Sequence, residues 1–200
     1  MRHTWWRLLV FVAAASVPAF WLYRGVTAAL GPDPGKVLVD NLGQGALVLL
    51  LCSLAMTPLQ RLSGWAGWMA VRRQLGLWSF AYGTLHLIGF SYFLLGLDFG
   101  ALPAELRDRP YIAVGFVGYL GLLALACTST RASMRWLGKR WKRLHSLIYP
   151  ILLVVLLHML WVVRSDLGQW ALYAVIGVVL LSLRTPPGKR LLEKLKATRH

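Results

Sequence analysis

Three histidines lie inside the apolar stretches of this 200-residue chain, and they are the residues best suited to do chemistry there: His86, His145 and His158. A polar, ionisable side chain is costly to place in apolar surroundings, so each of the three is a candidate functional group. His3 and His200 lie beside the chain ends and carry no such argument.

Two imidazoles at the same depth on different helices can bind the iron of a haem from opposite faces. The apolar stretches contain no Asp or Glu. A zinc or non-haem iron centre would therefore lack further ligands, and a carboxylate proton relay is disfavoured as well. The spacing favours haem ligation by His86 and His158, and the alternative for each is a structural hydrogen bond to Ser, Tyr or a backbone carbonyl. For His145 three roles stay open: a second haem ligand, a contact for a quinone or flavin electron donor, or an interfacial imidazole among lipid phosphates.

The elements that must position these histidines are long apolar segments. The chain is 58% hydrophobic, and runs of about 20 apolar residues are long enough to cross a bilayer. The sequence predicts an all-α, polytopic membrane helix bundle that forms a single domain over residues 1–200, with no evident internal repeat. The six predicted transmembrane helices are residues 8–23, 42–59, 75–97, 111–127, 144–163 and 169–183. The first could instead be a cleaved signal peptide, but its apolar run continues past the small residues 13–16, so we expect it to be retained as a helix.

The net charge of +15 is explained by topology. Its cations lie between the apolar blocks, so the expected partner is the lipid bilayer and not nucleic acid. With the N- and C-termini both cytoplasmic, 17 of the 22 Lys and Arg residues fall inside and six of the seven acids fall outside, which is the positive-inside pattern. The outside cations are Arg24, Lys36, Arg107, Arg109 and Arg164. The last three, with the acidic residues of the outer loops, are candidates for docking a soluble partner.

This orientation gives the depth of each histidine. His86 follows the inner cation Arg73 by 13 residues, and His158 follows Arg143 by 15 residues. At the rise of an α-helix these separations are ~20 Å and ~22 Å, whereas His145 is only ~3 Å deep. We therefore predict that His86 and His158 lie level, slightly outside the midplane, and that His145 lies near the inner surface.

Glycines accompany the histidines along the predicted helices. Gly83 and Gly89 flank His86 and are expected to give a flat macrocycle room to approach the backbone. Gly115 and the glycines that follow it at positions 118 and 121 are expected to serve helix packing, as small residues do in membrane bundles.

Four segments of the chain then resemble a known family. They are LAMTPLQRL, VRRQLGLWSFAYGTLHLIGFSYFLLGLD, RPYIAVGFVGYLGLLALACTS and LGKRWKRLHSLIYPILLVVLLHMLW, which run from Leu54 to Trp161. In order and spacing these strings resemble the MsrQ (YedZ) family, the haem-binding membrane subunits of the bacterial periplasmic methionine sulfoxide reductase system. That family belongs with the ferric reductase-like transmembrane domains.

The resemblance implies an electron-transfer subunit of the bacterial cell inner membrane, and not the catalytic subunit of its oxidoreductase system. It implies haem b, with FMN as a further cofactor, and it maps the family's histidines onto His86, His145 and His158. The implied electron donor is the quinone pool or a cytoplasmic flavin reductase. The implied acceptor is a periplasmic molybdopterin-containing methionine sulfoxide reductase that repairs oxidised proteins.

One departure from the wider ferric-reductase pattern bears on the number of haems. Those domains usually hold two haems between four histidines, but here Arg72 and Arg73 stand where an inner partner would lie. Arginine cannot ligate iron, although it can pair with a propionate. We therefore expect one haem, between His86 and His158. The alternatives are another quinol-linked b-type cytochrome, which normally has two histidine pairs, and a non-redox membrane transporter or assembly factor.

Overall fold

The computed structural model describes residues 3–27, 30–163 and 167–197, and within them the chain is helical throughout with no strand. The all-α prediction is confirmed. Arg164, an expected docking residue, lies outside the described residues, as do Arg2 and His200. The elements are α1 (Thr4–Val26), α2 (Pro34–Ser63), α3 (Gly67–Gly89), the π-helical turn η1 (Phe90–Leu94), α4 (Leu102–Asp108), α5 (Tyr111–Cys127), α6 (Arg131–Leu137), α7 (Lys139–His145), α8 (Ile148–Val162), α9 (Leu167–Ser182) and α10 (Pro186–Ala197).

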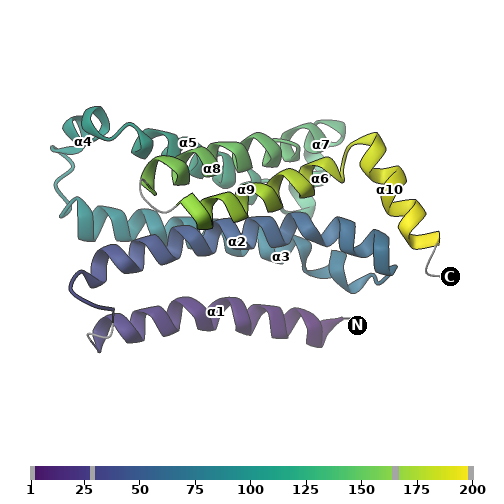
Figure 1. Cartoon of the computed structure of the whole chain (residues 1–200), viewed down its shortest axis with the longest axis horizontal. Coiled ribbons are helices and arrows are strands. Elements are labelled where there is room, and N and C mark those ends of the chain that lie inside the picture. Colours follow the sequence, from purple (N-terminus) through teal and green to yellow (C-terminus); the bar gives the residue numbers. More distant parts are fainter. Residues whose placement is uncertain (1–2, 28–29, 164–166, 198–200) are drawn as a thin grey trace.

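The bundle is arranged around α2. Figure 1 shows α1 at one edge and α5 and α8 at the other, with α2 and α3 between them. α2 packs most extensively against α3, α5 packs against α8, and α9 contacts both α2 and α8. The largest apolar core lies where α2, α5, α8 and α9 meet, and its buried members are Leu47, Leu50, Leu51, Leu54, Leu122, Leu125, Ile151, Leu152, Leu156 and Leu180.

The start and end of α2 follow from local sequence. The Asp33 carboxylate accepts a hydrogen bond from the Lys36 amide at 3.0 Å, and Pro34 occupies the first helical position, where a missing N–H costs nothing. The helix ends at Gly64, whose φ of 71° is the left-handed conformation that glycine adopts most readily.

Two prolines lie inside the long helices, and both are compensated by side chains from other helices. A proline lacks the N–H that would bond the carbonyl four residues earlier. In α1, Pro18 frees the carbonyl of Ala14, which accepts the Tyr82 hydroxyl at 2.7 Å. In α2, Pro58 frees the carbonyl of Leu54, which accepts an N–H of Arg184 at 2.6 Å.

The outer surface of the bundle is apolar. On α9, Leu172, Val175 and Val178 are each about 60% exposed, and α1 also presents large apolar side chains along its length. Contiguous apolar surface of this extent is covered by lipid when a helix crosses a bilayer.

Among the residues that the structure describes, three stretches are long and apolar enough to cross a membrane: Thr4–Val26, Pro34–Ser63 and Lys139–Val162. Two bent pairs raise this number to five, since α4 meets α5 at 107° and α9 meets α10 at 86°. α3, which carries Arg72 and Arg73 in its first half, is not among these stretches. The prediction of six spans is therefore not confirmed by length and composition.

The two ends of the bundle differ in charge. One end of the bundle holds α6, α7, α10 and the beginning of α1 (Figure 1). Because the cations of α6, α7 and α10, together with Arg61 near the end of α2, gather there, we call it the basic end. α4 lies at the opposite end, which we call the α4 end.

Candidate paired-histidine site

The rings of His86 on α3 and His158 on α8 lie close together. Their centroids are 6.3 Å apart and their planes are inclined at 82°. The structure thus brings together the two imidazoles that the sequence analysis expects to lie level on different helices.

Each of these rings is held by a backbone carbonyl of a neighbouring helix. His86 Nδ1 lies 2.8 Å from the Val39 carbonyl oxygen of α2, and His158 Nδ1 lies 2.7 Å from the Tyr111 carbonyl oxygen of α5. A carbonyl only accepts hydrogen bonds, so Nδ1 must carry the proton in both neutral rings. Nε2 then keeps its lone pair, which is the form in which imidazole binds a metal.

Each ring also lies against a glycine of the same neighbouring helix. A Cβ added at Gly43 would lie 2.9 Å from Nδ1 and Cε1 of His86, and one at Gly115 would lie 2.7 Å from Cε1 of His158. Atoms this close cannot coexist without displacement, so these two positions require glycine for the rings to sit where they do.

The two halves of the site repeat one pattern. In each, the histidine lies 47 positions after the residue whose carbonyl it binds, and the glycine lies four positions after that residue. The α2–α3 pair and the α5–α8 pair are therefore equivalent around the site. The sequence shows no evident repeat, because the shared pattern consists of two backbone carbonyls, which any residue type can supply, and two glycines.

The pattern also relates the inner residues of the two halves. Arg73 precedes His86 by 13 positions, and His145 precedes His158 by the same number. The first half thus has an arginine where the second has a histidine, and a guanidinium does not ligate iron. A second matched imidazole pair is therefore missing from the repeat.

The paired site fits a haem by distance and by donor type. A metal bonded to imidazole nitrogens at ~2 Å on both sides separates the ring centroids by ~6 Å, close to the observed value. The donors are two neutral imidazoles, each fixed by a second hydrogen bond. Within the described residues no group of three or more His, Cys, Asp or Glu side chains gathers as a metal site of another kind would require.

His145 lies apart from this pair, at the basic end. Its ring stacks on Trp141 with centroids 4.0 Å apart, and its Nε2 lies 3.1 Å from the Thr128 hydroxyl. That hydroxyl donates to the Ala124 carbonyl at 2.7 Å, so it accepts from His145. Of the three roles left open for His145, this arrangement supports the interfacial one.

The flanking glycines do not face the His86 ring. A Cβ at Gly83 would meet only the side chains of Tyr119 and Leu122, no closer than 3.8 Å, and one at Gly89 would meet Val39 at 3.0 Å. Their expected role, to give a macrocycle room beside the backbone, stays a prediction. The ring lies instead against Gly43, which the sequence analysis missed.

The other glycine expectations are partly met. Gly118 and Gly121 pack against the side chains of Val155 and Ile151, as predicted. Gly115 was expected to serve packing alone and instead also faces the His158 ring. A glycine in a neighbouring span at the depth of each histidine was the available signal for both ring contacts.

An apolar groove of about 290 Å³ opens beside the carbonyl partner of His158, at the α4 end. Its lining residues are Pro110, Tyr111, Leu160, Trp161, Val163 and Leu167. The groove brings the surface of the bundle close to the paired histidines.

The fold and the paired site agree with what the sequence comparison finds. Residues 42–156, a stretch that includes both His86 and the turn of α8 before His158, match the family described as "Ferric reductase like transmembrane component". The chain therefore belongs to the ferric reductase-like family of transmembrane proteins.

Within that class the chain is similar to a particular protein. It is 42% identical over 187 residues to the "Protein-methionine-sulfoxide reductase heme-binding subunit MsrQ" of Yersinia pseudotuberculosis serotype O:1b (strain IP 31758), and the match covers 92% of each chain. The predicted resemblance to the MsrQ family is confirmed.

Proposed function

We propose that this protein is the haem b-binding membrane subunit of a methionine sulfoxide reductase system and that it transfers electrons to the catalytic subunit. The observation that carries the proposal is the pair of imidazoles, whose ring centroids lie 6.3 Å apart and whose Nδ1 atoms are each hydrogen-bonded to a backbone carbonyl. Family membership and the similarity to the Yersinia haem-binding subunit support it.

His86 and His158 would hold the haem through Nε2, and a haem bound there supplies one-electron chemistry. With both imidazoles as its ligands, the haem would carry electrons and would not bind oxygen or substrate. The Val39 and Tyr111 carbonyls keep each proton on Nδ1 and fix the ring orientation. Both histidines are half-buried between the helices of the bundle.

We propose that the protein lies in the bacterial inner membrane with six spans. In the proposed orientation the basic end, with the N- and C-termini, faces the cytoplasm. The gathering of cations at one end supports this orientation. α3 is proposed as a span because it packs along α2 and carries His86.

Electrons would enter from the basic end and leave from the α4 end. A quinone or a cytoplasmic flavin reductase is the proposed donor, and a periplasmic molybdopterin-containing methionine sulfoxide reductase is the proposed acceptor. His86 lies in the last turn of α3, toward the α4 end, and the groove beside Tyr111 opens there. FMN is a further proposed cofactor, supported by the resemblance to the family alone.

An absorption spectrum of the purified protein tests haem binding. The wild type is expected to show a Soret band and sharp α and β bands after dithionite reduction. His86→Ala and His158→Ala should each abolish or strongly alter these bands, because each removes one axial ligand. His145→Ala is the matched control and should keep the wild-type spectrum.

Colourless wild-type protein would contradict the proposal. So would loss of haem in His145→Ala with retention in His158→Ala. Size-exclusion profiles in detergent identify any variant that has lost its fold.

The assignment to the reductase system needs a separate measurement. Dithionite-reduced protein should be reoxidised rapidly only when a periplasmic methionine sulfoxide reductase and methionine sulfoxide are both present. If the haem is present but that pair does not reoxidise it, the protein is a different b-type cytochrome.

A further inference from the structure

A second pocket lies at the basic end, between α2 and the bend that joins α9 to α10. Its volume is about 160 Å³, several times the ~30 Å³ that one water molecule occupies in the liquid. The lining residues are Thr57, Pro58, Arg61, Tyr149, Leu183, Arg184, Lys189 and Leu192.

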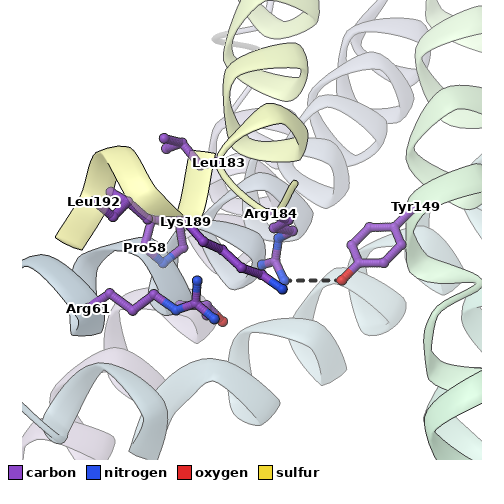
Figure 2. Close-up of a pocket in the computed structure, with 8 residues that line it drawn as sticks. Pro58, Arg61, Tyr149, Leu183, Arg184, Lys189 and Leu192 are labelled. Atoms are coloured by element: carbon purple, nitrogen blue, oxygen red, sulfur yellow. Dashed lines mark hydrogen bonds between the residues drawn. The ribbon is translucent and has the colours of Figure 1, made fainter. Parts of the chain in front are cut away.

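Three of the lining side chains are cations from three different segments. Figure 2 shows Arg61, Arg184 and Lys189 reaching into the same space. No carboxylate is among the described residues that line the pocket. Like charges repel at this range, so the cluster favours an anionic ligand that neutralises it.

One of these cations is fixed in place. Arg184 donates to the Leu54 carbonyl that Pro58 frees, at 2.6 Å, and to the Tyr149 hydroxyl at 3.2 Å. Both partners are neutral, so the positive charge of Arg184 is held rigidly at the pocket without being cancelled. A preorganised cation binds an anion with little loss of side-chain entropy.

Two buried polar atoms at the pocket also lack partners within the described part of the chain. They are the Thr57 hydroxyl oxygen and Nε of Arg184. Both are donors, and buried donors without an acceptor are rare in folded proteins. An oxyanion in the pocket would accept from them.

The pocket is also lined by the amphipathic helix α10. α10 turns away from α9 by 86° and buries Leu192 at the pocket, while Leu191 and Leu195 are about half exposed. A short amphipathic helix of this kind, with lysines and arginines beside leucines, typically lies in the membrane interface, where lipid phosphates are found.

We propose that this pocket binds a phosphate group, carried by an anionic lipid headgroup or by a soluble phosphate compound. Arg61 and Lys189 supply the exchangeable positive contacts, and Arg184 and Thr57 supply fixed donors. The paired histidines take no part in this site.

The test uses the purified full-length protein in a phosphate-free maltoside detergent. Phosphatidic acid is compared with diacylglycerol of the same acyl chains, and inorganic phosphate is compared with chloride at equal ionic strength. Binding is followed by native mass spectrometry and by the thermal unfolding midpoint. We expect saturable binding and a raised midpoint with phosphatidic acid but not with diacylglycerol, and the inorganic phosphate arm shows whether a free anion suffices.

Two variants locate the binding to the pocket. Arg61→Gln and Lys189→Gln should each weaken phosphate binding about tenfold, because each removes a charge-assisted hydrogen bond. Arg190→Gln is the matched control, since it removes the same charge from the neighbouring position of α10, where the side chain is exposed and does not line the pocket.

The outcomes separate the sources of the phosphate group. Binding of phosphatidic acid alone identifies a lipid site, and binding of inorganic phosphate identifies a site open to soluble compounds. Equal weakening in Arg190→Gln, equal binding of diacylglycerol, or no saturable binding in either arm overturns the proposal. The haem spectrum should be unchanged in Arg61→Gln and Lys189→Gln, so this site and the haem proposal stand or fall separately.

Discussion

At the residue scale, the glycines at the paired site have a specific physical role. In an α-helix the carbonyl of residue i bonds the N–H of residue i+4, and the Cβ of that later residue tilts back toward the carbonyl. Gly43 and Gly115 are the i+4 residues for the Val39 and Tyr111 carbonyls. Without a Cβ there, the second lone pair of each carbonyl is open to an imidazole N–H.

We predict that Gly43→Ala impairs haem binding. Its Cβ would lie 2.9 Å from the His86 ring, which must then move away from the Val39 carbonyl. The expected result is a lower haem content per protein or a shifted α band in the reduced spectrum. The control is Gly76→Ala on α3, whose Cβ would meet nothing closer than 3.6 Å. A Gly43→Ala spectrum identical to that of Gly76→Ala would show that the glycine is not required.

At the element scale, side-chain donors from neighbouring helices make helix-interior prolines tolerable in this bundle. In a bilayer no water is available for a freed carbonyl, so another donor is needed. Tyr82 supplies it to α1, and Arg184 supplies it to α2. These contacts also attach α1 to α3 and attach α2 to the region after α9, so each proline marks a place where two helices are joined.

The contact at α1 gives a double-mutant test. Tyr82→Phe leaves the Ala14 carbonyl buried without a donor and should destabilise the protein by ~1 kcal/mol. In a Pro18→Ala background the backbone N–H returns to that carbonyl, so the same Tyr82→Phe change should cost much less. Thermal unfolding of the four proteins in detergent measures the coupling.

Tyr92→Phe is the control for loss of a hydroxyl, because Tyr92 is 60% exposed. If Tyr82→Phe is equally costly with Pro18 and with Ala at position 18, the hydroxyl is not compensating for the proline.

At the scale of the whole molecule, the distribution of charge supports the orientation proposed above. α1 begins at the same end of the bundle as α10, and the cations of α6, α7 and α10 gather there (Figure 1). Positive loops are retained on the cytoplasmic side of bacterial membranes. In the proposed orientation the α4 end faces the periplasm, where a soluble partner would meet the groove beside Tyr111.

Two matched cysteine variants test this orientation in a background in which both native cysteines are replaced by alanine. Thr27 and Thr185 are both exposed. Thr27 directly follows α1 and Thr185 directly precedes α10, and the end of α1 and the start of α10 lie at opposite ends of the bundle (Figure 1). In intact spheroplasts a membrane-impermeant maleimide should label Thr27→Cys at once and Thr185→Cys only after lysis. The reverse order of labelling would invert the proposed topology.

The sequence by itself determined the helical class, the apolar segments and the approximate level of His86 and His158. The length of a hydrophobic run depends on local composition and the rise per residue of an α-helix is constant, so spans and depths can be counted along the chain. Loop charge likewise indicated which ends of the helices lie together, and the motif strings indicated the family.

Only the tertiary structure decided which groups surround each ring and each freed carbonyl. The partners of His86 and His158 are carbonyls 47 positions away, and a carbonyl has no side-chain signature in a sequence. Gly43 is one of many small residues until the packing of α2 on α3 sets its distance from His86. The meeting of Arg61, Arg184 and Lys189 likewise depends on the bend between α9 and α10, because helix crossings and bends are set by packing over the whole bundle and not by local residue preferences.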